Sequence, residues 1–206
     1  MAVWWNTQRV VLCVNPVDFL NVGKKTLMIK KPNKVLAFIG DGEGKTSAAI
    51  GHAIRAAGHN KKVAIIQFLK GIDKCGEYLY LTEKNSKIEI HLSGERFFLR
   101  SEAEKYKHLE KAKEGLALAE NLLLSGRYFL IVLDEIFDII SYDLISTNDV
   151  EKLLDVTLNE KCQTNLILTG RKLPSELSKK IDLITQMRKV KHYYDLGEKG
   201  IEGLDW

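Results

Sequence analysis

Cysteine is scarce in this sequence, and its scarcity narrows the class of protein to be expected. The three cysteines, Cys13, Cys75 and Cys162, are odd in number and lie far apart in the chain. A disulfide framework or a zinc site needs more cysteines at closer spacing. The set therefore predicts reduced thiols and a cytoplasmic protein.

Long apolar runs and charge of one sign are also missing. The longest apolar runs have the length of strands, well short of the ~20 residues that span a bilayer. The net charge of +4 is mild and evenly spread, whereas a nucleic-acid interface needs a clustered basic face. We therefore expect neither a membrane nor a nucleic acid as partner. A length of 206 residues with 28% charged residues suits one domain with a sizeable core.

From Lys34 onwards, short apolar strands alternate with helical segments. The pattern predicts strands at 35–39, 62–69, 88–92, 128–133, 164–168 and 183–190, and helices at 46–57, 76–83, 102–125, 150–158 and 173–180. Near-continuous apolar strands separated by helices are typical of an α/β fold. We therefore predict a mostly parallel sheet with helices on both faces.

Residues 1–27 fit this pattern poorly. They contain an apolar run at 10–14, but no small-residue cleavage signal follows it. The segment could be an extra edge strand, a weak targeting sequence, or a translated leader with Met28 as the functional start. We favour the last two over the strand, so the predicted domain spans 28–206.

A glycine-rich stretch follows the first predicted strand. It reads Gly40-Asp41-Gly42-Glu43-Gly44-Lys45-Thr46-Ser47 and opens a helix. In such a turn, backbone N–H groups, the helix N-terminus and the lysine converge on phosphate oxygens, and the hydroxyl after the lysine is placed to bind Mg²⁺. The alternative is a structural glycine-rich turn that Lys-Thr follows by chance. It is the weaker interpretation, because strand, loop and helix occur in the order that a phosphate-binding loop requires. We predict nucleoside triphosphate binding, although only three residues separate Gly40 from Gly44 where the usual pattern has four.

Two acidic residues close the fourth predicted strand. Asp134 and Glu135 would lie at the carboxyl edge of the sheet, where ligands of parallel α/β proteins bind. Beside a phosphate loop, such an acid is the expected second anchor for Mg²⁺. Spacing alone does not decide which carboxylate is a metal ligand and which a general base.

Arg171 follows the fifth predicted strand in the run Leu168-Thr-Gly-Arg171. Its guanidinium could clamp phosphate or an anionic edge of a substrate. It could equally stand in water beside a plain strand-to-helix turn with Gly170 at positive φ.

Several segments together resemble a known family. They are residues 40–49, Arg55-Ala-Ala-Gly-His59, Gln67-Phe-Leu-Lys-Gly71, Leu133-Asp-Glu135, Leu168-Thr-Gly-Arg171, Val190-Lys-His192 and Lys199-Gly-Ile-Glu202. In this order they resemble the P-loop ATP:corrinoid adenosyltransferases, the cob(I)yrinic acid a,c-diamide adenosyltransferase family. The resemblance covers residues 34–206. The short phosphate loop is itself a trait of that family.

The resemblance implies a RecA-like P-loop fold and a particular reaction. Co(I) of a corrinoid would attack the 5′-carbon of ATP, release triphosphate and form adenosylcobalamin or a precursor, in biosynthesis or salvage. It also implies Mg²⁺ or Mn²⁺, an electron donor such as a flavoprotein, and a homodimer. The rival readings from the residues are a P-loop nucleoside kinase and a nucleotide-switched or DNA-handling ATPase.

The same resemblance assigns roles to residues. Lys45 and Glu135 would be catalytic, and Thr46, Glu135 and Asp134 would form the metal site. Contacts to the nucleotide or the corrin are implied for Gly40, Asp41, Gly42, Glu43, Gly44, Lys45, Thr46, Ser47, Arg55, Arg171, Phe97 and His192.

The sequence departs from the family at several of these positions. Glu43 stands where lysine is usual, so it either weakens the hold on ATP or faces solvent. Phe97 could contact the corrin or simply pack in the core, and the family's nearby tryptophan reads as Leu99. A histidine such as His192 at a strand end is more often a surface residue, and the resemblance favours a nucleotide or corrin contact without assigning a role.

Overall fold

The computed structural model describes residues 33–71, 75–83, 87–95 and 102–205. The predictions for residues 1–27, Phe97 and Leu99 lie outside these described residues. Among the described residues, none of the helices is long and apolar enough to cross a membrane.

A six-stranded sheet in the order β3-β2-β4-β5-β1-β6 forms the centre of the domain, and every pair of neighbours is parallel. The strands are β1 (Val35–Ile39), β2 (Val63–Phe68), β3 (Ile88–Ser93), β4 (Leu130–Asp134), β5 (Asn165–Gly170) and β6 (Leu183–Gln186). The helices are α1 (Lys45–Gly58), α2 (Gly76–Glu83), α3 (Glu102–Leu124), α4 (Ile136–Ser141) and α5 (Thr147–Leu158), with 3₁₀ helices η2 (Ser175–Lys180) and η3 (Tyr193–Leu196).

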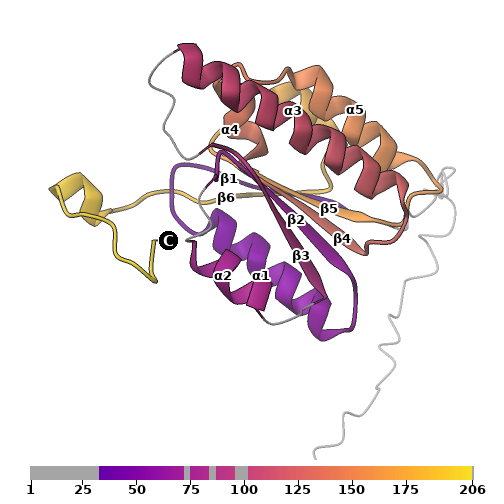
Figure 1. Cartoon of the computed structure of the whole chain (residues 1–206), viewed down its shortest axis with the longest axis horizontal. Coiled ribbons are helices and arrows are strands. Elements are labelled where there is room, and N and C mark those ends of the chain that lie inside the picture. The colour runs from indigo at the N-terminus through magenta and orange to yellow at the C-terminus, as the bar shows by residue number, and fades with distance from the viewer. Residues whose placement is uncertain (1–32, 72–74, 84–86, 96–101, 206) are drawn as a thin grey trace, which may run out of the picture. The chain divides into compact units, whose positions relative to one another are not determined.

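Both faces of the sheet are covered, which confirms the predicted α/β class (Figure 1). Every residue of β2 and of β4 is buried, so these central strands have apolar side chains on both faces. One face packs against α3, α4 and α5 through residues such as Ile66, Leu133 and Leu154. The other face packs against α1 and α2 through Ile65, Ala53 and Leu81. The core therefore lies in two layers, one on each face of the sheet.

The structure differs from the predicted elements at three main places, besides shifts of one to three residues at the ends of other elements. The last strand ends at Gln186 instead of 190, because its neighbour β1 ends at Ile39 and offers no further partner. The predicted helix at 173–180 is a 3₁₀ helix that begins after Pro174, since proline disfavours helical conformation in the residue before it. The helix α4, directly after β4, was not predicted, because its six residues are too few for helical periodicity to be recognised.

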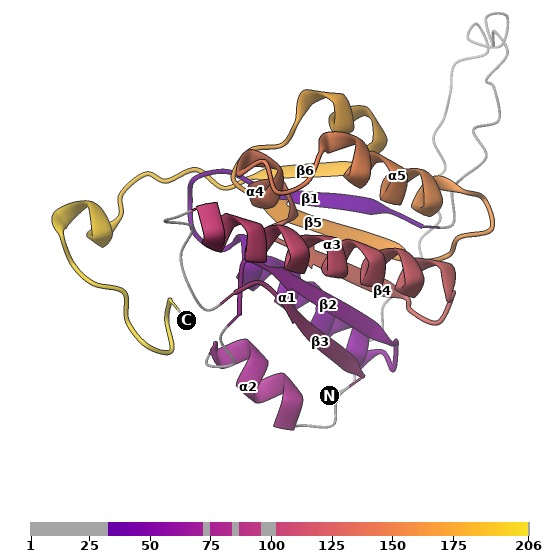
Figure 2. The ribbon, with the colours of Figure 1, turned by 45° about the horizontal axis from the view of Figure 1, so that its top comes forward.

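The chain after β6 returns to the loop after β1. Met187 N donates to Ile39 O at 2.7 Å, and Gly42 N donates to Met187 O at 2.8 Å. In Figure 2 this segment, drawn in yellow, leaves the sheet at the same edge as the loop after β1. The C-terminal segment therefore fixes the outer side of the glycine-rich loop.

Gly40 is required where this segment meets the loop. Its φ is +113°, and a Cβ built on it would lie 2.2 Å from Met187 O. We expect Gly40→Ala to lower the free energy of unfolding by about 1–3 kcal/mol, through backbone strain and the clash. Urea unfolding followed by circular dichroism measures the change.

The matched control for this prediction is Gly51→Ala in α1. Apart from its chain neighbours and the adjacent backbone of α1, no atom of the described residues lies within 4 Å of a Cβ built on Gly51. Alanine in a helix interior should stabilise the protein by about 0.5–1 kcal/mol. Equal effects of the two substitutions would contradict the account of the loop.

Candidate active site

The glycine-rich loop ends at a helix N-terminus that no side chain caps. Gly44 is the N-cap of α1, with φ 100° in the left-handed region, and no acidic residue lies in the first turn. The first N–H groups of α1 consequently have no partner within the helix and favour an anion. Lys45 Nζ lies beside them and donates to Gly42 O at 2.7 Å.

A cavity of about 430 Å³ opens in front of this loop. Its lining residues come from the loop, from the carboxyl ends of three strands, from α2 and α4, and from the C-terminal segment. They are Glu43, Gly44, Lys45, Thr46, Ser47, Lys70, Gly76, Glu77, Glu135, Asp138, Thr169, Arg171, Gly203, Leu204 and Asp205. The structure thus brings most of the predicted site residues together at the carboxyl edge of the sheet.

Asp134 is a fully buried carboxylate behind this cavity, at the end of β4. Its Oδ1 accepts from Thr46 at 3.0 Å and from Thr169 at 2.7 Å, and its Oδ2 accepts from Gln67 at 3.2 Å. Buried carboxylates are tolerated when hydrogen bonds and a counter-charge satisfy them. Asp134 therefore ties β2, β5 and the start of α1 into one unit.

Lys70 supplies the counter-charge, two residues after β2. Its Nζ lies 3.4 Å from Asp134 Oδ2 and 2.9 Å from Glu77 Oε1 on α2. Burial alone would lower the pKa of Lys70, but the carboxylates of Asp134, Glu77 and Glu135 outweigh it and raise that pKa. The ammonium therefore stays charged and joins α2 to Asp134.

Glu135 lies in the cavity in an unusual backbone conformation. Its φ is 63°, and its N–H donates to Thr169 Oγ1 at 2.8 Å, which places the residue between β4 and α4. Burial, together with the Asp134 carboxylate, raises the pKa of Glu135 to about 7. Burial likewise raises the pKa of Asp138, which accepts from Arg171 N at 3.1 Å. The cavity thus crowds carboxylates that would be stabilised by a cation.

The raised pKa of Glu135 predicts a pH dependence of stability. Between pH 4.5, its ordinary value, and about 7, the folded protein holds a proton that the unfolded chain releases, so the free energy of unfolding falls as pH rises through this window. We expect Glu135→Gln to lose less stability than the wild type between pH 5 and pH 8, in urea titrations without added metal. Glu110→Gln on α3, where the side chain is exposed, serves as control. Parallel pH profiles for wild type and Glu135→Gln would contradict the prediction.

Five of the predicted ligand residues that the structure describes do not line this cavity: Gly40, Asp41, Gly42, Arg55 and His192. Arg55 is one of them. It lies in the last turn of α1, roughly 15 Å along the helix from Lys45 at 1.5 Å per residue. It lines a different hollow, so the structure does not bring it to the phosphate loop. Asp41 lies on the outer side of the loop, where its Oδ1 accepts from Lys189 N at 3.2 Å.

His192 lies beside the loop rather than in the main cavity. It lines a smaller hollow with Gly42 and Glu43, and its Nδ1 accepts from Tyr194 N at 3.1 Å. Glu43 is exposed and lines both hollows. Tyr193 donates to Asp205, which closes the C-terminal segment on itself beside Glu43.

Sequence reasoning missed several residues of the cavity. Lys70, Thr169 and Asp138 follow or end strands at the carboxyl edge, and this position is a signal that could have found them. Glu77 lies within α2, and Asp205 lies in the C-terminal segment. No local pattern marks these two, because only tertiary packing brings them to the cavity.

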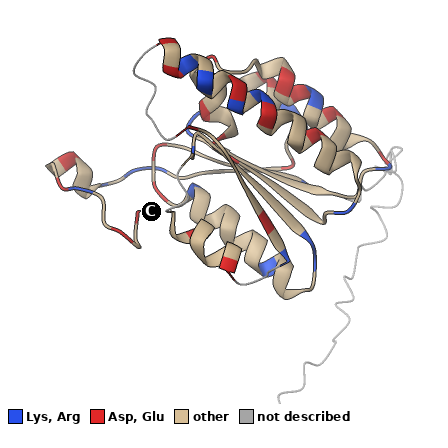
Figure 3. Cartoon of the chain, viewed as in Figure 1, with Lys and Arg blue, Asp and Glu red and all other residues tan. Residues whose placement is uncertain are grey.

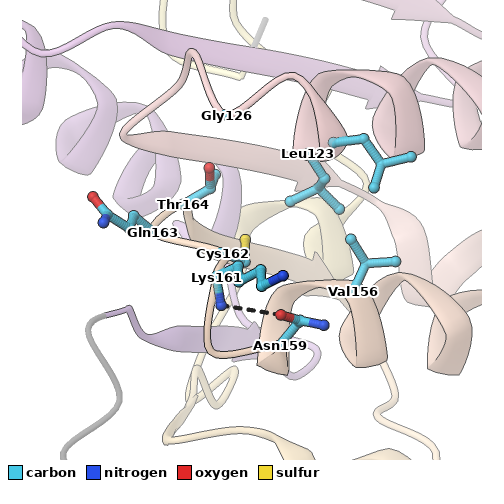
Figure 4. Close-up of a pocket in the computed structure, with 9 residues that line it drawn as sticks. Leu123, Gly126, Val156, Asn159, Lys161, Cys162, Gln163 and Thr164 are labelled. Atoms are coloured by element: carbon cyan, nitrogen blue, oxygen red, sulfur yellow. Dashed lines mark hydrogen bonds between the residues drawn. The ribbon is translucent and has the colours of Figure 1, made fainter.

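A second hollow, of about 400 Å³, lies between the ends of α3 and α5 (Figure 4). Leu123 and Val156 form apolar walls, and Cys162 lies between them and the start of β5. Lys161 N donates to Asn159 Oδ1 at 3.0 Å within its rim. None of the predicted site residues lines this hollow, so the loop cavity remains the candidate active site.

Comparison with known proteins gives one family. Residues 31–206 match the model of the family described as ATP:corrinoid adenosyltransferase BtuR/CobO/CobP. The chain is 31% identical over 173 residues to a corrinoid adenosyltransferase of Escherichia coli (strain K12), which covers 84% of this chain and 85% of that protein. It is 30% identical to the corrinoid adenosyltransferase CobA of Salmonella typhimurium, with the same coverage. It is 29% identical to one from Pseudomonas aeruginosa, over 84% of this chain and 83% of that protein.

Proposed function

The chain belongs to the ATP:corrinoid adenosyltransferase family, and from this premise we propose how its loop cavity carries out adenosyl transfer. The protein transfers the 5′-deoxyadenosyl group of ATP to the Co(I) centre of a corrinoid. One observation supports the assignment of this reaction to the loop cavity. The uncapped N-terminus of α1 and Lys45 lie at the cavity, and both belong to residues 31–206, which match the family. The triphosphate of ATP would lie there.

The reaction places unusual demands on a phosphate loop. Co(I) donates an electron pair to the 5′-carbon of ATP, a Co–C bond forms, and the bond from C5′ to the triphosphate oxygen breaks. The nucleophile belongs to the second substrate, so no protein residue has to activate it. The protein has to hold C5′ in line with cobalt and stabilise the charge that grows on the leaving triphosphate. Lys45, Arg171 and the loop N–H groups are the donors suited to this work.

The charge balance of the cavity argues for a divalent cation. Its lining holds three cations, Lys45, Lys70 and Arg171, but five carboxylates. A triphosphate would meet net repulsion in this lining unless further positive charge entered with it. When bound, Mg²⁺ would supply that charge and neutralise the departing triphosphate.

The oxygen donors of the cavity fit Mg²⁺. We propose that Thr46 Oγ1 and Glu135 hold it, with Asp134 orienting Thr46 from behind through their 3.0 Å hydrogen bond. Among the described residues, no three His, Cys, Asp or Glu side chains form a group that could hold a metal. Phosphate oxygens and water would therefore complete the coordination, as Mg²⁺ usually requires.

The remaining partners are proposed from the family resemblance, the reaction chemistry and the charge pattern. Co(I) has to be supplied by reduction, so we propose an electron donor such as a flavoprotein as a partner. We further propose that the protein is a homodimer and that it acts in the cytoplasm. A nucleic acid is not proposed, because acidic and basic residues alternate along α3 (Figure 3). Analytical ultracentrifugation measures the oligomeric state.

An anaerobic assay tests the proposed function. The protein is incubated with ATP, Mg²⁺ and chemically reduced cob(I)alamin, and the absorption spectrum is followed for an alkyl-cobalt product. We expect this product only when protein, ATP and reduced corrinoid are all present. Formation of ADP with a phosphorylated deoxynucleoside, or ATP hydrolysis stimulated by DNA, without alkyl-cobalt, would overturn the proposal.

Glu43 offers a test of the triphosphate's position. Its exposed carboxylate lines the cavity beside Lys45. We expect Glu43→Lys to tighten ATP binding about threefold to tenfold at low salt, and less at high salt, because an exposed charge is screened. Isothermal titration with MgATP measures this, and Glu83→Lys at the end of α2, where the side chain is exposed, is the control. Unchanged affinity would mean that Glu43 faces solvent away from the triphosphate.

A further inference from the structure

A hollow of about 520 Å³ lies at the opposite edge of the sheet, where the strands begin. We call it the amino-edge hollow. It is lined by Leu36, His52, Arg55, Ala56, His59, Lys61, Phe129, Leu130, Asn165 and Ile167. None of these residues takes part in the proposed reaction.

The floor of the amino-edge hollow is apolar. Ala56, Leu130 and Ile167 are buried there and belong to the core beneath α1. Phe129 lies at its side with 43% of its surface exposed. Lys61 Nζ lies 5.5 Å from the centre of the Phe129 ring. The hollow therefore offers an apolar surface and an aromatic ring to a planar ligand.

The rim is basic and lacks acids. Arg55 and Lys61 are exposed, His52 and His59 lie beside them, and no Asp or Glu lines the hollow. Within the described part of the chain, no ion pair joins Arg55 or Lys61 to a carboxylate.

Other charges nearby do not cancel this excess. Burial, and then the charge of Arg55, lower the pKa of His52, so His52 adds little charge at neutral pH. The end of α1 contributes about half a negative charge, less than the two fixed cations. The rim consequently presents an excess of positive charge above the apolar floor.

We propose that the amino-edge hollow binds a small planar aromatic anion. The rings would lie against Phe129 and the apolar floor, and the carboxylate, sulfonate or phosphate would lie between Arg55 and Lys61. The two side chains provide charge-assisted hydrogen bonds, and desolvation by the apolar floor strengthens them. Because α1 separates this hollow from the loop cavity, the ligand is a second one, independent of the adenosyl transfer.

A matched pair of fluorescent probes tests the proposal on the full-length protein. 8-Anilinonaphthalene-1-sulfonate carries the anionic group, and N-phenyl-1-naphthylamine has the same rings without it. We expect the sulfonate to bind about tenfold more tightly than the neutral probe. The charge reversal Arg55→Glu/Lys61→Glu should remove that preference, whereas Lys107→Glu/Lys113→Glu, which reverses two exposed lysines on α3, should keep it. Saturating MgATP should leave the affinity unchanged.

Several results would overturn the proposal. Equal affinity for the two probes, equal loss in both double variants, or displacement of the sulfonate by MgATP would each do so. Sedimentation gives a further test. If Arg55→Glu/Lys61→Glu changed the oligomeric state while probe binding stayed the same, the proposal would be overturned, because a second copy of the chain would then cover the hollow. If the reversal variant lacks the native circular dichroism spectrum, Arg55→Gln/Lys61→Gln is measured in its place with the same expectations.

Discussion

Lys45→Ala is expected to reduce the rate of adenosyl transfer by about 10³-fold or more, which corresponds to ~4 kcal/mol of transition-state stabilisation. Lys45 lies at the start of α1 and lines the loop cavity, with its Nζ 2.7 Å from Gly42 O. Burial, and to a lesser extent the charge of Arg171, lower the pKa of Lys45. The carboxylates of Asp138, Glu135 and Asp134 raise it but do not outweigh the burial. The lysine thus lies beside the uncapped N-terminus of α1, where we propose that the triphosphate binds.

The loss should appear mainly in kcat. Negative charge on the triphosphate grows as the C5′–O bond breaks, so the contact with Lys45 is stronger in the transition state than in bound ATP. Steady-state kinetics with cob(I)alamin and varied ATP separate kcat from KM. Lys113→Ala removes an exposed lysine from α3 and should keep wild-type kinetics. Turnover within tenfold of the wild type for Lys45→Ala would mean that the loop does not hold the leaving group.

Asp134→Asn is expected to lower the free energy of unfolding by about 2–4 kcal/mol and to reduce activity at least 10²-fold. The Asp134 side chain is fully buried, and donors surround both of its oxygens. Near Oδ2 lie Gln67 Nε2 and Lys70 Nζ, which only donate hydrogen bonds, and the Thr46 hydroxyl at 3.2 Å, which can also accept one. The neutral amide also removes one of the carboxylates that pair with Lys70, which keeps Glu77 at 2.9 Å.

Urea unfolding and the adenosylation assay together measure this prediction. Asp155→Asn is the matched control, because Asp155 pairs with Lys180 on the surface and Lys180 keeps its second partner, Glu151. A surface pair of this kind should be worth less than about 1 kcal/mol. If Asp134→Asn were no less stable than Asp155→Asn, Asp134 would not be the centre of the buried network described above.

Much of the fold could be predicted from the sequence because its strands are buried on both faces. Continuous apolar runs such as β2 mark parallel strands, and α2 lies at the predicted residues. The exceptions have two kinds of cause, a partner strand that the local pattern does not contain and a proline that it does. β6 ends early because its neighbour β1 ends, and 173–180 is a 3₁₀ helix because Pro174 delays its start.

Site residues that follow the ends of strands could be predicted from the sequence, whereas residues that only tertiary packing brings to the cavity could not. Lys45 and Thr46 were predicted from the glycine-rich loop and Glu135 from the end of its strand, and all three line the loop cavity. Arg171 was left open between a ligand contact and solvent, and it lines the same cavity. Arg55 was predicted from its motif alone, and the length of α1 separates it from the cavity. Glu77 and Asp205 reach the cavity only through the packing of α2 and of the C-terminal segment.

The central claim is that the loop cavity holds a triphosphate that departs whole from C5′, rather than presenting a γ-phosphate for transfer. Phosphorus NMR of the products formed from ATP, Mg²⁺ and cob(I)alamin under anaerobic conditions tests it most directly. We expect intact triphosphate in a one-to-one ratio with alkylated cobalt, and formation of both products slowed by about 10³-fold or more with Lys45→Ala. ADP or inorganic phosphate as the main product, with no alkyl-cobalt formed, would contradict it.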